Sequence, residues 1–160
     1  MWSQVWQTIL TEFSDLGDVA AMTQVCVRML VAVVLGAVLG YERESAGAAA
    51  GLRTHMLVAL GSALFVLIPL QAGMQFGDVS RVLQGLTAGI GFLGAGAIWK
   101  SENDKQITGL TTAASVWLTA AVGVSAGMGR EGTAVVSALF ALAILSLLRF
   151  KTDSAARQKR

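Results

Sequence analysis

Residues 84–99 read QGLTAGIGFLGAGAIW, an uncharged, glycine-rich stretch close to the length of a membrane span. Four more apolar runs accompany it along the chain. As helices rising about 1.5 Å per residue, such runs can cross a hydrocarbon core of about 30 Å. The five runs are Met22–Gly40, Leu52–Leu70, Leu83–Trp99, Ile107–Ala126 and Gly132–Leu148. The sequence therefore predicts an all-α fold, a polytopic membrane bundle of five transmembrane helices.

The composition supports this class. Hydrophobic residues make up 54% of the chain and charged residues 14%. This composition contains too few polar residues to cover the surface of an ordinary soluble domain. We expect one membrane domain over residues 21–150. The single cysteine, Cys26, excludes an intrachain disulfide. The net charge of +2 fits membrane orientation, and no nucleic-acid partner is expected.

Positive charge is distributed unevenly between the two sides of the membrane that the five runs would cross. If the first connection is cytoplasmic, nine of the twelve Lys and Arg residues fall inside, Arg81 and Arg130 fall outside, and Arg28 lies within the first run. Positive charge gathers on the cytoplasmic side of membrane proteins, so we expect an outer N-terminus and a cytoplasmic C-terminus in a bacterial inner membrane. The nine inner residues are Arg43, Arg53, Lys100, Lys105, Arg149, Lys151, Arg157, Lys159 and Arg160.

Two short segments flank the predicted bundle. Residues 1–20 lack the basic start of a signal peptide, so we expect them to stay attached. Apolar side chains recur in this segment at helical spacing, which predicts an amphipathic helix in the outer lipid interface. They are Trp2, Trp6, Ile9, Phe13 and Leu16. Residues 151–160 form a basic tail, expected to rest near anionic lipid on the cytoplasmic face.

The glycines of the third run match the dinucleotide-binding spacing G-x-G-x-x-G at Gly89, Gly91 and Gly94. That motif needs a preceding strand and water around a phosphate, so helix packing is the better interpretation. At about 100° per residue, Gly85, Gly89 and Gly96 share one face, and Gln84, Thr87, Gly91 and Gly94 share the opposite face. Small residues on both faces predict a helix at the centre of the bundle. The first face is also the expected contact of a homodimer.

Hydroxyl groups follow one side of the fourth run within an arc of about 100°. They belong to Thr108, Thr111, Thr112, Ser115 and Thr119. If this stripe faces Gln84 and Thr87, the two sets line a polar path through the bilayer. The alternative is that each hydroxyl bonds a carbonyl of its own helix or bridges two helices.

Charged residues occur at both membrane surfaces. Arg28 lies about 9 Å along the first run from its outer end, where an arginine costs up to about 3 kcal/mol unless compensated. Snorkelling to the headgroups would relieve this cost, and so would pairing with Asp15, Asp18 or Asp78. Several charged and polar residues lie at the inner ends of the first two runs. We expect them to form a solvated salt-bridge cluster, and the alternative is that they form a binding site. They include Glu42, Arg43, Arg53, Thr54 and His55.

Four ordered blocks of this sequence resemble the MgtC/SapB group of bacterial inner-membrane proteins. They are the first-run arginine followed by GYERE, then GLRTHMLVALGSALF, then DVSRVLQGLTAGIGFLGAGAIW, then ITGLTTAASVWLTAAVGVSAGMG, between Arg28 and Gly129. The resemblance implies a five-helix membrane domain linked to adaptation to magnesium limitation and, in pathogens, to virulence. The best-known members continue into a soluble ACT-like domain, whereas this sequence stops just past its fifth run.

The resemblance also marks particular residues. They are Arg28, Glu42, Arg43, Gly51, Arg53, Thr54, His55, Asp78, Arg81, Gln84, Gly89, Gly91, Gly94, Gly96, Gly109, Thr111 and Thr112. None of them belongs to an enzyme motif. We therefore expect no catalytic residue, no cofactor and no bound metal.

Two functional hypotheses follow. The first is a regulator that contacts another membrane complex through its helices, as MgtC-like proteins are thought to restrain ATP synthase. The second is a transporter or channel for an ion or small solute along the Gly- and Thr-lined path. The first is preferred because Mg²⁺ favours carboxylate oxygens and no Asp or Glu lies deep within a run.

Overall fold

A computed structural model describes residues 1–14, 17–100 and 107–157, with side chains up to residue 147. Six helices and one pair of two-residue strands occur in this part of the chain. In order they are α1 (Trp2–Glu12), α2 (Val19–Ser45), α3 (Leu52–Gln71), α4 (Phe76–Gly96), β1 (Trp99–Lys100), β2 (Ile107–Thr108), α5 (Leu110–Gly127) and α6 (Glu131–Arg157). The predicted all-α class is confirmed.

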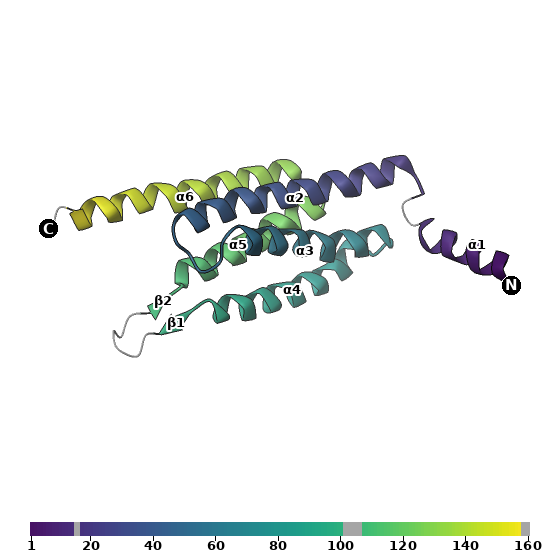
Figure 1. The fold of residues 1–160 in the computed structure, drawn as a ribbon, viewed down its shortest axis with the longest axis horizontal. Coiled ribbons are helices and arrows are strands. Elements are labelled where there is room, and N and C mark those ends of the chain that lie inside the picture. Colours follow the sequence, from purple (N-terminus) through teal and green to yellow (C-terminus); the bar gives the residue numbers. More distant parts are fainter. Residues whose placement is uncertain (15–16, 101–106, 158–160) are drawn as a thin grey trace.

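Helices α2 to α6 run up and down along one long axis (Figure 1). The α2–α3 connection, the β1–β2 hairpin and the end of α6 lie at one end of the bundle, and the α3–α4 connection lies at the other. This alternation is the arrangement that successive membrane spans require. Three helices, α2, α3 and α5, are long and apolar enough to cross a membrane, and the apolar part of α6, Glu131–Leu147, is shorter. The chain is therefore a membrane protein by composition, while the count of five spans stays a prediction.

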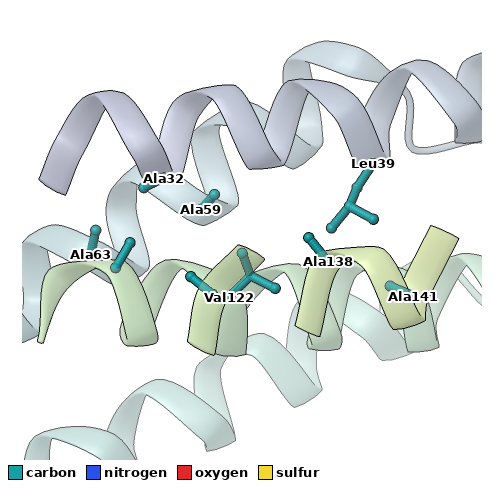
Figure 2. Close-up of a cluster of buried hydrophobic side chains, with 9 residues drawn as sticks. Ala32, Leu39, Ala59, Ala63, Val122, Ala138 and Ala141 are labelled. Atoms are coloured by element: carbon teal, nitrogen blue, oxygen red, sulfur yellow. The ribbon is translucent and has the colours of Figure 1, made fainter. Parts of the chain in front are cut away.

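The bundle core consists of short side chains. Ala32 of α2 faces Ala59 and Ala63 of α3, while Val122 of α5 and the alanines of α6 close the other side (Figure 2). In α6 the buried alanines are Ala134, Ala138 and Ala141. They recur at i, i+4 and i+7, which places them on one face of the helix. Small residues suit a membrane bundle, because helix association in lipid depends on close backbone packing.

Two glycine pairs bring α3 against its neighbours. A methyl group built at Gly36 or Gly40 of α2 would overlap the backbone of His55 or Leu52 of α3. On the other side of α3, a methyl at Gly123 or Gly127 of α5 would overlap the carbonyl oxygens of Ala59 and Ala63. Both pairs have the G-x-x-x-G spacing of close helix contacts. Helix α3 therefore lies at the centre of the bundle, between α2 and α5.

The prediction that the third run lies at the centre is wrong for this chain. Helix α4 lies at the edge of the bundle (Figure 1), and its principal contacts are with α3 and α5. Its buried residues are Val79 and Gly94. The glycine content predicted close packing on both faces of this helix, but among these predicted glycines Gly94 alone has a neighbour within 4 Å of a methyl built there.

The boundaries of two predicted runs also shift. Helix α4 begins at Phe76 and ends at Gly96, and the chain then forms the β1–β2 ladder, in which Trp99 pairs with Thr108. Helix α5 begins only after Gly109, whose φ of +86° favours glycine. Thr108 therefore lies outside the helix that was expected to carry it.

The flanking segments have simple structures. No residue of α1 is buried, and Trp2, Trp6 and Phe13 are exposed, so the interfacial position of this helix stays a prediction. Leu16, expected on the same stripe, lies outside the described residues. At the other end, α6 continues as helix to Arg157, into the segment predicted as a tail. Residues 158–160 and the inner-side Lys105 also lie outside the described residues.

Candidate functional site

The imidazole of His55 is fully buried, with 0% of the residue exposed. Its Nδ1 lies 2.9 Å from the carbonyl oxygen of Gly51, and its Nε2 lies 3.2 Å from Oγ of Ser115 on α5. A carbonyl can only accept, so we assign the proton to Nδ1, which leaves Nε2 of a neutral ring as an acceptor. This bridge joins α3 to α5 beside the close contact at Gly36. The sequence did not predict the bridge, because its two members are sixty positions apart.

The hydroxyls of α5 divide between two surroundings. Thr112, Ser115 and Thr119 are buried, and Ser115 and Thr119 donate to the carbonyl oxygens of Thr112 and Ser115, both at 2.8 Å. The Ser115 proton can serve either Thr112 or His55, but not both. Thr111 and Thr108 are exposed, and the Thr108 hydroxyl donates to the Trp99 carbonyl at 3.2 Å. Local carbonyl bonding and one helix bridge therefore account for the hydroxyls of Ser115 and Thr119.

The predicted polar path does not form among the residues that the structure describes. Gln84 and Thr87 are exposed on α4, whereas the buried hydroxyls belong to the core of the bundle. Thr87 donates to its own Leu83 carbonyl at 2.7 Å. The cavity between α4 and α5, of about 310 Å³, is lined by Thr87 and Ser125 but by none of the buried hydroxyls. The two sets thus face different surroundings.

At the end of α2, Glu42 and Arg43 form a two-pronged ion pair. Arg43 donates from Nε to Oε2 of Glu42 at 2.5 Å and from a terminal nitrogen to Oε1 at 2.8 Å. Both side chains are largely buried, with exposures of 8% and 14% for Arg43 and Glu42. The solvated cluster expected from the sequence is therefore mostly a buried pair, in which geometry matters more than for a surface ion pair.

The neighbouring charged residues have other surroundings. Glu44 accepts from the backbone N–H of Leu52 at 2.8 Å and so caps the first turn of α3. Arg53 is exposed and Thr54 is half-buried. The Glu44 bond therefore orders the α2–α3 connection.

The charge of Arg28 is compensated by a backbone carbonyl at the end of α5. It is half-buried, and a terminal guanidinium nitrogen donates to the carbonyl oxygen of Gly127 at 3.4 Å, at the C-terminus of α5. The negative end of a helix attracts a cation. Neither Asp18 nor Asp78 forms an ion pair with Arg28 in the described part of the chain, and Asp15 lies outside it. Arg28 therefore joins α2 to α5 near the outer end of the bundle.

Helix α4 leaves most of its predicted site residues exposed. They are Asp78, Arg81, Gln84, Gly85, Thr87, Gly89, Gly91 and Gly96. Of the predicted packing glycines, Gly94 alone has a neighbour, the Ala113 side chain of α5, within 4 Å of a methyl built there. A shallow cavity of about 380 Å³ separates Gly85 and Gly89 from Phe65 of α3. Helix α4 therefore has a broad surface that no other helix of the described chain covers.

A larger, mostly apolar cavity lies between α2, α5 and α6. Its volume is about 440 Å³, and Thr111 and Ser115 are its polar lining residues. In the described ranges 1–14, 17–100 and 107–147, no three His, Cys, Asp or Glu side chains are arranged to hold a metal ion.

Comparison with known protein families shows which family contains this sequence. The family model for the MgtC family matches residues 29–153. The chain belongs to the MgtC family. Its resemblance to the MgtC/SapB group, first carried by the four sequence blocks, is thereby confirmed.

Several curated proteins are similar over about three quarters of the chain. Protein SrpB of Synechococcus elongatus is 43% identical over 130 residues, covering 74% of this chain and 71% of that protein. Protein MgtC of Brucella abortus is 44% identical over 120 residues, covering 74% and 48%. The putative magnesium transporter YhiD of Escherichia coli is 35% identical over 131 residues, covering 76% and 59%.

The chain thus spans about half the length of MgtC from Brucella abortus, the part that aligns with it. No solved structure matches the chain. The family match over residues 29–153 includes α3 to α5, so the His55–Ser115 bridge and the exposed α4 surface both lie within it.

Proposed function

We propose that this chain is a non-enzymatic integral protein of the bacterial inner membrane that regulates another membrane complex through contacts made by α4. Its role belongs to adaptation to magnesium limitation or to virulence, as in MgtC-type proteins. The outer N-terminus and cytoplasmic C-terminus expected from the charge distribution orient it in that membrane. The complex it regulates is an enzyme such as ATP synthase.

The side chain of Gln84 carries this proposal. Gln84 lies eight residues into α4, about 12 Å along the helix from Phe76. It is exposed, and its side chain has no hydrogen bond within the described residues. An amide exposed to hydrocarbon is costly, and glutamine side chains commonly bond across helices in membranes. Thr87 and Gly91 continue this polar, small surface, which we call the partner face. A transmembrane helix of a partner complex would satisfy the amide.

The transport hypothesis has two observations in its favour. The Escherichia coli relative YhiD is called a putative magnesium transporter, and Thr111 opens into the cavity between α2, α5 and α6. The burial of Thr112, Ser115 and Thr119 in the bundle supports the regulatory proposal more strongly, because the hydroxyls of Ser115 and Thr119 bond carbonyl oxygens of their own helix.

Site-specific photocrosslinking tests the regulatory proposal. A benzoylphenylalanine at Gln84 should capture a subunit of the regulated complex in native membranes, while the same probe at Phe140, exposed on α6, should not. If the complex is ATP synthase, the full chain should lower ATP-driven proton pumping in inverted vesicles, and Gln84→Leu should relieve that effect. Equal capture at both positions, together with Mg²⁺ flux into liposomes containing the purified chain, would favour transport instead.

A further inference from the structure

The cavity between α2, α5 and α6 is open on one side. Its floor is formed by Leu39, Ser115 and Ala141, which are buried. Exposed residues line it as well, so the cavity opens at the surface of the bundle. They are Leu110, Thr111, Ala114 and Ile144. Because most of these side chains are apolar and belong to membrane helices, the opening faces the hydrocarbon of the bilayer.

This cavity lies within one leaflet. On α5 it extends from Leu110, the first residue of the helix, to Leu118, about 12 Å along the axis. That length is close to half of a hydrocarbon core of about 30 Å. Leu110 lies at the end of the bundle that carries the β1–β2 hairpin (Figure 1), which is the cytoplasmic end expected from the charge distribution. The cavity therefore runs from the inner surface to about the middle of the bilayer.

The dimensions of the cavity decide what can enter it. A volume of about 440 Å³ over a length of about 12 Å corresponds to a width of about 7 Å. A transmembrane helix with its side chains is about 10 Å wide or more, so the cavity is too narrow for a helix of another protein. A lipid acyl chain is narrower and flexible, and such chains surround the opening. Apolar walls that face an empty space lose dispersion contacts, and an acyl chain in the cavity supplies them.

Polar groups lie toward the inner end of the cavity. Thr111 is in the first turn of α5, and its hydroxyl has no hydrogen bond within the described residues. The Ser115 hydroxyl, one turn deeper, already bonds the Thr112 carbonyl. On α6, Arg149 follows the lining residue Leu145 by four positions, which places it on the same face of the helix and one turn closer to the cytoplasm. A hydroxyl donor and a basic residue at this end complement a negatively charged lipid headgroup.

We infer that this cavity binds one acyl chain of an anionic phospholipid from the inner leaflet, with the headgroup beside Thr111 and the turn of α6 that carries Arg149. The site includes neither Gln84 nor the partner face of α4. It is therefore independent of the proposed function, and the failure of either proposal would leave the other intact.

Photolabelling in vesicles tests the site. The full chain is reconstituted in phosphatidylcholine that contains a small fraction of phosphatidylglycerol with a diazirine in one acyl chain. After illumination, peptide mapping should find label on Leu118 and Leu145, measured relative to Phe140, which is exposed on α6. Ala114→Phe fills the cavity and should lower this ratio by about fivefold. Ala121→Phe is the matched control, because Ala121 is also exposed on α5 but lines the separate cavity against α4. A ratio that falls equally in both variants, or in neither, overturns the inference.

The charge of the headgroup is tested with the same diazirine chain on phosphatidylcholine. Phosphatidylglycerol should label the cavity about fivefold more strongly, which is the effect of one basic residue near an anionic headgroup. Arg149→Gln should remove this preference, whereas Arg157→Gln, about two turns further along α6, should keep it. Equal labelling by the two lipids in the parent chain, or a preference that survives Arg149→Gln, would overturn the assignment of an anionic headgroup.

Discussion

Nε2 of His55 on α3 lies 3.2 Å from Oγ of Ser115 on α5, and both side chains are buried. The contact lies on the side of α3 that faces α5, while Gly36 and Gly40 hold α2 against the backbone of the same turn. One histidine therefore lies where three helices are closest. Nδ1 bonds the Gly51 carbonyl, and Nε2 accepts from Ser115 whenever that hydroxyl is not bonded to the Thr112 carbonyl, so each ring nitrogen has a buried partner within reach.

Removing the serine hydroxyl should weaken this junction. We expect Ser115→Ala to lower the free energy of unfolding by about 1 kcal/mol, because Nε2 of the imidazole loses its buried partner. Ser125→Ala is the control on the same helix, since the Ser125 hydroxyl bonds only the Ala121 carbonyl one turn away. It should change stability by less than about 0.5 kcal/mol. Reversible unfolding in mixed micelles measures both values, and equal effects would show that the bridge contributes nothing beyond its local bond.

Closing the space between α3 and α5 should be more damaging. Gly123→Ala places a methyl against the Ala59 carbonyl oxygen, which the helix backbone cannot move aside. We expect a loss of about 2 kcal/mol or more in unfolding free energy. Gly61→Ala, in the interior of α3 with open space around it, should instead be neutral or stabilising by up to about 1 kcal/mol. If both substitutions have the same effect, helix propensity and not close packing governs this interface.

The sequence predicts some of these elements better than others. The second run, predicted as Leu52–Leu70, is found as α3 at Leu52–Gln71, because an uninterrupted apolar run leaves a membrane helix few alternatives. The density of glycine on α4 predicted close packing there, yet the close contacts occur at Gly36, Gly40, Gly123 and Gly127. Spacing does not separate the two cases, since Gly85 and Gly89 have the same G-x-x-x-G spacing as the two close pairs. Which pair faces a neighbour depends on helix rotation within the bundle, and one sequence does not encode that locally.

For the polar residues too, the sequence predicted part of what the structure shows. The sequence correctly indicated that Arg28 needs compensation, but the acceptor is the backbone carbonyl of Gly127, a group that no residue-type pattern reveals. Likewise, the inner charged cluster was predicted, while the burial of the Glu42–Arg43 pair was not, because burial depends on how α2 meets its neighbours.

Loss of the Arg28 charge should loosen the outer end of the bundle. Arg28→Gln removes a cation from the C-terminal end of α5 and should lower unfolding free energy by about 1 kcal/mol. Gly129→Ala acts on the same contact, because a methyl there would lie 2.6 Å from a guanidinium nitrogen and the φ of +73° disfavours a side chain. A double-mutant cycle should therefore give less than the sum of the two effects. Arg130→Gln, at an exposed position, is the control and should have little effect. Full additivity would mean that Arg28 and Gly129 act independently.

The threading itself predicts an alternating pattern of accessibility. In a Cys26→Ser background, single cysteines at the exposed positions Ala49 and Ala72 bracket α3, and Lys100 and Arg130 extend the series past α4 and α5. A membrane-impermeant maleimide added to intact cells should label the cysteines at 72 and 130 and should reach those at 49 and 100 only after lysis. The reason is that the excess of Lys and Arg keeps the α2–α3 and α4–α5 connections in the cytoplasm. Because α4 carries two charges and a glutamine, it is not among the three helices selected as spans by length and composition, and the contrast between positions 72 and 100 decides whether it crosses. Labelling of both from outside would place α4 on one side of the membrane, and labelling of 49 but not 72 would invert the whole arrangement.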